Sequence, residues 1–173
     1  MTINEVRALI ENQNYQQAIE ECKRLLETCS NQPAELLRLL ADTYWLQGNC
    51  SDALIFRKQI VSLGDAELKD YYLGAETSIE AGDLSQAKQY LLKLLEISEE
   101  SKESWFDSAA YFYLSYIEMK MNRNAEALRY LDKYVDLEPE LPMVLPSGET
   151  MTHKQLRAEI ARQQKTKRVY KFD

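Results

Sequence analysis

The sequence predicts an all-α fold, a right-handed solenoid of about four stacked helix pairs followed by a C-terminal capping helix. Three observations lead to it. A short turn segment that ends in alanine recurs, with its alanines at positions 18, 53, 87 and 127. Apolar residues repeat at helical spacing between these turns, and the chain has only 5 glycines and 4 prolines. The spacings of 35, 34 and 40 residues are typical of arrays of two-helix repeats.

Each turn segment carries the residues that a tight connection between helices needs. Glycine or asparagine relaxes the end of a helix, a polar residue caps the next helix, and the alanine lets two helices approach closely. The first segment has Gln13 where two of the others have glycine. Together with the apolar pattern, the turns predict helices at residues 3 to 12, 15 to 29, 34 to 47, 51 to 63, 67 to 81, 85 to 98, 103 to 121 and 124 to 137.

We place the repeat domain at residues 1–137. Three further segments follow it. Three of the four prolines fall in residues 138–150, which predicts an extended connector. Residues 151–166 predict a capping helix that starts from a threonine cap and covers the open end of the array. Residues 167–173 form a basic tail. Before the fourth turn, residues 98 to 103 either extend a helix or form a loop.

The fourth unit carries the clearest motif, Asn124-Ala-Glu-Ala-Leu-Arg-Tyr-Leu-Asp-Lys-Tyr-Val-Asp-Leu-Glu-Pro139. With the other three turns, this motif resembles the tetratricopeptide repeat (TPR) family over about residues 3–139. The first three units lack the closing proline. The resemblance implies a protein that binds another polypeptide in a concave groove lined by the first helix of each pair.

Residues on those first helices that are not committed to packing form stripes at i, i+3, i+7 and i+10. The stripes combine aromatic rings with charges of both signs, and aromatic residues and arginine are the types that tend to dominate binding energy at interfaces. The alternative interpretation is that the aromatic members pack between neighbouring repeats. The predicted partner-binding groove consists of Arg7, Glu35, Arg38, Asp42, Trp45, Lys69, Tyr72, Glu76, Phe112, Tyr116 and Met119.

One TPR subclass holds the terminal carboxylate of chaperone tails through lysine, arginine and asparagine at set groove positions. Here those positions hold Arg7, Arg38, Asp42, Glu76 and Tyr116, so the match is poor. The net charge is −7, and residues 153 to 173 carry five positive charges in excess, which leaves −12 on the first 152 residues. Complementarity with that acidic body favours a mixed-charge or basic partner.

Catalytic, metal and cofactor sites lack their usual sequence signals, so we predict no enzyme, no cofactor and no small-molecule substrate. The single histidine, His153, has no cysteine or carboxylate at ligand spacing. No phosphate-binding glycine loop and no Cys-x-x-Cys pair occur. The three cysteines, Cys22, Cys29 and Cys50, predict reduced thiols in a cytoplasmic protein, and no apolar run is long enough to span a membrane.

The sequence therefore predicts a cytoplasmic protein–protein interaction module. Small acidic chains that resemble this family include adaptors, secretion chaperones and toxin-neutralising immunity proteins, and we favour a dedicated partner. Self-assembly into a homo-oligomer and a nucleic-acid contact through the basic tail are the alternatives. The tail itself has three interpretations: a solvated end, a strap on the acidic body, or a contact for an anionic ligand.

Overall fold

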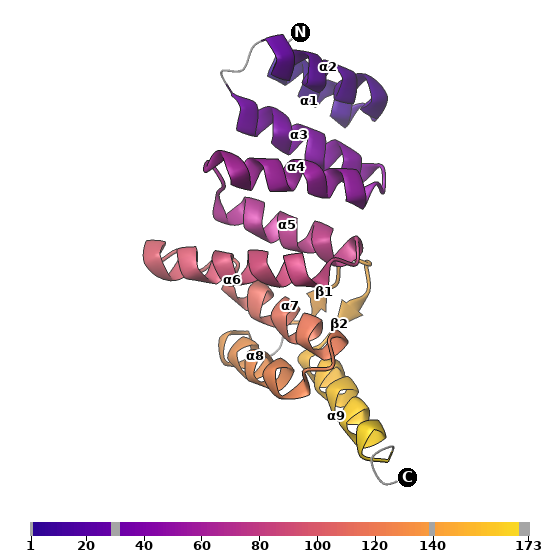
Figure 1. Cartoon of the computed structure of the whole chain (residues 1–173), viewed down its shortest axis with the longest axis vertical. Coiled ribbons are helices and arrows are strands. Elements are labelled where there is room, and N and C mark those ends of the chain that lie inside the picture. The colour runs from indigo at the N-terminus through magenta and orange to yellow at the C-terminus, as the bar shows by residue number, and fades with distance from the viewer. Residues whose placement is uncertain (1, 29–31, 139–140, 170–173) are drawn as a thin grey trace. The chain divides into compact units, whose positions relative to one another are not determined.

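The computed structural model describes residues 2–28, 32–138 and 141–169, and for residues 167–169 it describes the backbone alone (Figure 1). The chain falls into two compact units, residues 1–81 (unit 1) and residues 82–173 (unit 2). Almost all of the described structure is α-helical, which confirms the predicted all-α class. Cys29 and the last four residues of the predicted tail lie outside the described part of the chain.

Unit 1 is a succession of antiparallel helices in which each packs on the next along the chain, and the first also contacts the third (Figure 1). Its core contains Val6, Cys22 and Leu40, each without exposed surface. The helices are α1 (Ile3–Glu11), α2 (Tyr15–Thr28), α3 (Pro33–Leu46), α4 (Cys50–Leu63) and α5 (Leu68–Glu80).

Helices α1 and α4 begin at polar caps, and α3 begins at a proline. At α1, the Thr2 side chain accepts from the Glu5 amide and the Glu5 carboxylate accepts from the Thr2 amide at 2.7 Å. Such a capping box satisfies two amides that have no partner within the helix. Pro33 opens α3, where its missing amide costs nothing, and Asn49 caps α4 by accepting from the Asp52 amide at 3.2 Å.

The four predicted turns share one backbone conformation, which confirms the repeat. Gln13, Gly48, Gly82 and Asn122 have φ angles of 61°, 75°, 78° and 61°, all in the left-handed region. The alanine that follows each turn, at positions 18, 53, 87 and 127, has no exposed surface. A larger side chain at these alanines would separate the helices, so the repeating alanine follows from close helix packing.

Unit 2 contains three successive helices, a short hairpin and a final helix that packs on α7 and α8. The hairpin is antiparallel and pairs Met143 with Met151. Thr152 caps the final helix, because its hydroxyl accepts from the Gln155 amide at 3.2 Å. The elements are α6 (Leu84–Ser101), α7 (Asp107–Lys120), α8 (Asn124–Leu137), β1 (Met143–Val144), β2 (Thr150–Met151) and α9 (His153–Val169).

The connection between α6 and α7 differs from the helix limits that the sequence predicts. The first of these helices runs to Ser101 and the second begins at Asp107, four residues later than expected. Lys102 ends α6 with a left-handed φ of 62°. The Ser98 hydroxyl hydrogen-bonds to the Glu103 carbonyl and the Asp107 carboxylate at 2.7 and 2.6 Å, which fixes the loop between the helices.

Within the described residues, no helix combines the length and the apolar content that crossing a bilayer would take.

Candidate functional site

Unit 1 contains two adjacent cavities between α3 and α5, with volumes of about 180 and 290 Å³. Residues from the N-terminal parts of α3 and α5 line the smaller cavity, and residues from the C-terminal parts of the same helices line the larger one. Four residues line both cavities, namely Asp42, Arg57, Lys69 and Leu73. We refer to the two cavities together as the α3–α5 site.

Arg57 is the buried charge of this site. It projects from α4 and is only 3% exposed, while its partner Asp42 on α3 has a side chain that is 47% exposed. The Arg57 Nη2 atom donates to Asp42 Oδ1 at 2.5 Å. Its Nε and Nη1 atoms are buried and have no hydrogen-bond acceptor among the described residues. A guanidinium has five N–H donors, so most of its capacity stays unused.

A second ion pair closes the smaller cavity. The Arg38 guanidinium donates to both oxygens of Asp70, at 2.6 to 3.1 Å, and to the Asp65 carbonyl at 2.9 Å. The hydrogen bond to Asp70 raises the pKa of Arg38 above its ordinary value. Asp70 is buried and also accepts from the Glu67 amide at the start of α5. This bidentate pair therefore fixes the start of α5 against α3.

The larger cavity has an aromatic and apolar side. Trp45 is 40% exposed and its indole N–H donates to the Glu80 carboxylate at 2.5 Å. The Cys50 thiol donates to the same carboxylate at 3.2 Å. Burial, together with Glu80, raises the pKa of Cys50 to about 11, so this thiol is protonated at neutral pH and is a poor nucleophile.

The structure brings six of the predicted groove residues together at the α3–α5 site. Two others border it: Arg7 forms an ion pair with Glu35, and the Tyr72 hydroxyl donates to Glu76 at 2.8 Å. The six that line the cavities are Glu35, Arg38, Asp42, Trp45, Lys69 and Glu76.

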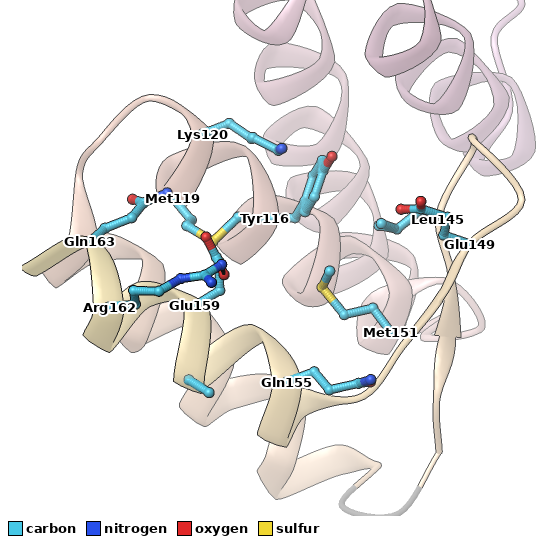
Figure 2. A pocket seen from close by; sticks show the side chains of 11 residues that line it. Tyr116, Met119, Lys120, Leu145, Glu149, Met151, Gln155, Glu159, Arg162 and Gln163 are labelled. Carbon is cyan, nitrogen blue, oxygen red and sulfur yellow. Dashed lines mark hydrogen bonds and ion pairs between the residues drawn. The ribbon is translucent and has the colours of Figure 1, made fainter.

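Unit 2 has a cavity of its own, of about 480 Å³, between α7, the hairpin and α9 (Figure 2). Tyr116 and Met119, both predicted groove residues, line it together with Met151 and Leu145 from the hairpin region. The Lys120 ammonium lies 5.2 Å from the centre of the Tyr116 ring. The remaining lining is polar and comes largely from α9, including the ion-paired Glu159 and Arg162.

The prediction that Phe112 lines the groove is wrong, because the structure places this residue in the core of unit 2. Its side chain has no exposed surface, and its ring stands edge-on to Tyr134 with centroids 5.2 Å apart. The predicted stripe rotates into the core at this point of α7, since Tyr113 and Leu114 are buried as well. Met119 is also nearly buried and contributes to the floor of its cavity. Phe112 is thus not available to a ligand.

Sequence reasoning missed six residues that also line the α3–α5 site, namely Leu46, Arg57, Glu67, Asp70, Leu73 and Thr77. The signal for Arg57 was present. In α4 the buried positions include Ala53, Arg57 and Ile60, so the arginine stands in the apolar stripe of its helix. Charged residues are almost never fully buried unless they are paired, and an arginine in such a stripe therefore marks a special environment.

No protein-family model matches the chain. Over 132 residues the chain is 26% identical to the human mitochondrial import receptor subunit TOM70. The aligned region covers 76% of this chain and 21% of that protein. The chain thus spans about a fifth of this curated relative.

Solved structures share the fold. A tetratricopeptide repeat protein from Parabacteroides merdae superposes with a TM-score of 0.74, at 16% identity, over 95% of this chain and 59% of that chain. MamA superposes with a TM-score of 0.68, at 20% identity, over 92% of this chain and 84% of that one. These likenesses, with the repeated turns, show a TPR-type fold.

Proposed function

We propose that this chain is a polypeptide-binding module that holds a segment of a partner protein at the α3–α5 site. One observation carries the proposal: six residues selected from sequence as ligand-facing line two adjoining cavities on α3 and α5. The TPR-type fold supports it, because helix-pair arrays present extended surfaces to peptides. The human protein to which part of the chain is similar is a mitochondrial import receptor subunit.

The lining indicates the chemistry of the partner segment. Trp45 and Leu46 are both exposed at the larger cavity and offer an apolar and aromatic anchor point. Asp42, Lys69 and Glu76 place charges of both signs around it. Interfaces of this kind combine a buried apolar anchor with polar contacts that fix its orientation. The partner segment is therefore mixed in charge, with at least one large apolar side chain.

The cavity in unit 2 supplies a second binding point. Met119 and Met151 both line this cavity together with Tyr116 (Figure 2). Methionine is flexible and polarizable, and methionine-rich surfaces adapt to apolar side chains of different shapes. We assign this cavity to an apolar residue of the same partner.

Within this function, the narrower roles are a dedicated chaperone and a toxin-neutralising immunity protein, both soluble in the cytoplasm. Each requires a single stoichiometric partner. A chaperone keeps its partner soluble until it is transferred, and an immunity protein suppresses the activity of its partner. Co-expression of the captured partner with and without this chain, read as solubility and as growth of the host, separates the two roles.

The test is affinity capture from the native cell extract with three baits: wild type, Trp45→Ala with Tyr116→Ala, and a control with Leu63→Ala and Leu137→Ala. The control residues are exposed apolar side chains outside both sites. We expect wild type and the control to retain one stoichiometric protein and the Trp45/Tyr116 variant to lose it at least tenfold. Circular dichroism checks that all baits are equally helical.

Retention of the same partner by the Trp45/Tyr116 variant would contradict the proposed sites. Capture of nucleic acid alone, or a mass that rises with concentration in the absence of any partner, would instead favour the basic tail or self-assembly.

A further inference from the structure

Trp105 is the most exposed large apolar residue in the described part of the chain, at 85%. It lies in the loop between α6 and α7, and hydrogen bonds hold that loop on both sides of it. The Glu103 carbonyl accepts from the Ser98 hydroxyl at 2.7 Å, and the Ser104 carbonyl accepts from the Asp107 amide at 3.2 Å. The backbone at Trp105 is therefore ordered in advance, so binding of its indole ring costs little further ordering.

A cavity of about 570 Å³ adjoins this loop within unit 2. Ser104 and Asp107, on either side of Trp105 in the sequence, line the cavity, whereas Trp105 does not. Its wall contains the stacked rings of Tyr111 and Tyr130, with centroids 6.4 Å apart, and aliphatic side chains from α6. Aromatic rings pair favourably with one another and bury large apolar areas. The wall is therefore suited to an indole ring that comes from outside the chain.

The charges at this cavity are nearly balanced, unlike those of the acidic body. Its lining contains three carboxylates and two lysines, a sum of −1, whereas the first 152 residues carry −12. Glu99, Lys102 and Lys133 form no ion pair with any residue that the structure describes. A surface with unpaired charges of both signs can pair with a second copy of itself, where two acidic surfaces would repel each other.

We propose that this surface forms a two-fold dimer of the chain, in which Trp105 of each copy enters the cavity of the other copy. In a two-fold interface the same patch meets itself, so each contact occurs twice. Because Trp105 adjoins the cavity, one two-fold axis between them places each ring opposite a cavity. The dimer surface shares no lining residue with the three cavities assigned to the partner polypeptide, so self-association and partner binding are separate properties.

Sedimentation equilibrium of the full chain, from low to high micromolar concentrations, tests the dimer. The mass of the wild type should rise from 20.2 kDa towards twice that value. Trp105→Ala should raise the dissociation constant of the dimer at least tenfold, because an anchoring tryptophan is lost from both halves of the interface. Trp45→Ala makes the same change at the other of the two tryptophans, in unit 1, and should leave this constant unchanged.

A mixing experiment tests the contact between ring and cavity. Leu92→Glu adds a charge to the cavity wall at a residue that is 41% exposed, and Leu63→Glu is its control at a similarly exposed leucine of unit 1. Trp105→Ala keeps an intact cavity and Leu92→Glu keeps Trp105. Their mixed dimer therefore retains one of the two contacts, and it should form more readily than a dimer of either variant alone, but less readily than that of the wild type.

Three results would overturn the dimer interface: a wild type that stays monomeric, a dimer that survives Trp105→Ala, or a mixture that associates no better than its two components. An equal loss of the dimer in Trp45→Ala would also overturn it, because self-association would then involve the α3–α5 site. Partner capture separates these results from a failure of the proposed function. Trp105→Ala should retain the captured partner, and Trp45→Ala with Tyr116→Ala should lose it.

Discussion

Unit 1 buries a cation as well as a carboxylate, Arg57 and Asp70, whereas the charged side chain buried in unit 2, among the described residues, is the carboxylate Glu118. Arg57 forms an ion pair with Asp42, whose side chain is about half exposed, and both residues line the cavities of the α3–α5 site. Unit 2 buries the Glu118 carboxylate on α7, which has no exposed surface. Glu118 forms an ion pair with Lys88 from α6, and Arg123 approaches it to 3.8 Å.

Arg57 lines both cavities of the α3–α5 site, whereas Glu118 is not among the residues that line the cavities described above. In unit 2, Lys88 and Arg123 form ion pairs with Glu118, although neither of its buried carboxylate oxygens has a hydrogen-bond partner among the described residues. In unit 1, Asp42 accepts a hydrogen bond from one nitrogen of the Arg57 guanidinium. The other two nitrogens have no acceptor among the described residues. Both units thus bury a charged group whose hydrogen bonding is incomplete among the described residues, and of these two groups Arg57 is the one that lines a cavity.

The largest effect that we predict concerns the core of unit 2. Phe112→Ala should lower the free energy of unfolding by about 3–5 kcal/mol, the usual cost of truncating a buried phenylalanine. Urea unfolding followed by circular dichroism measures it. Tyr116→Ala, one turn further along α7 and only partly buried, should cost clearly less. If the two substitutions were equally mild, Phe112 would belong to the ligand-facing surface after all.

The ion pair of Glu118 comes next. Lys88→Met leaves a buried carboxylate with only the more distant Arg123, and we expect a loss of about 2–3 kcal/mol in the free energy of unfolding. Glu118→Gln should cost less than half as much, because Lys88 and Arg123 are both partly exposed and can be solvated. Urea denaturation of the two variants gives both values. The reverse order would show that Glu118 is not the buried member of the pair.

The repeated helix pairs could be predicted from the sequence because their signals are local. A turn such as residues 48 to 53 combines a left-handed glycine, a capping residue and a buried alanine within six positions, so helix limits follow to within a few residues. The α6–α7 connection was harder. Its geometry depends on a left-handed Lys102 and on the hydrogen bonds of Ser98, and neither residue type signals a loop by itself.

The site could be predicted only in part, for a different reason. Stripes at helical spacing identify one face of each helix. This was enough to select Asp42, Trp45 and Lys69, which all line the larger cavity. The rotation of each helix against its neighbours decides which residues within a face are covered, and it buried Phe112. Arg57 belongs to the second helix of its pair, so a search confined to first helices could not find it.

An effect of about the same size should distinguish the two units by how their stability responds to alkaline pH. Burial raises the pKa of Cys22 from 9.0 to about 11. In the unfolded chain the thiol ionises near its ordinary pKa, so the unfolded state loses its proton first and stability falls as the pH rises between about 9 and 11. Two pKa units correspond to about 2–3 kcal/mol. Urea unfolding at several pH values measures the loss, which Cys22→Ala should reduce by that amount.

All three cysteines lie in the first 81 residues, so thiol ionisation acts on unit 1 alone. In unit 2 the pKa of Tyr134 is also raised by burial, but from a starting value of 10.0. Hydrogen exchange should therefore show peptides of α1 to α4 losing protection at a lower pH than peptides of α7 and α8. Simultaneous loss in both sets would mean that other groups control the alkaline transition.

The smallest effects that we predict are changes in stability on substitution of the left-handed residues in the turns. Gln13 and Asn122 occupy the left-handed conformation that glycine occupies at positions 48 and 82. Gln13→Gly should raise the free energy of unfolding by up to about 1 kcal/mol, because glycine adopts a positive φ without steric cost. Asn122→Gly should raise the free energy of unfolding by less, since asparagine tolerates the left-handed conformation better than glutamine. Gly48→Ala, with φ at 75°, should lose about as much as Gln13→Gly gains. Thermal melts of the three variants test this order, and a loss of stability in Gln13→Gly would mean that the Gln13 side chain contributes to the α1–α2 turn more than its backbone strain costs.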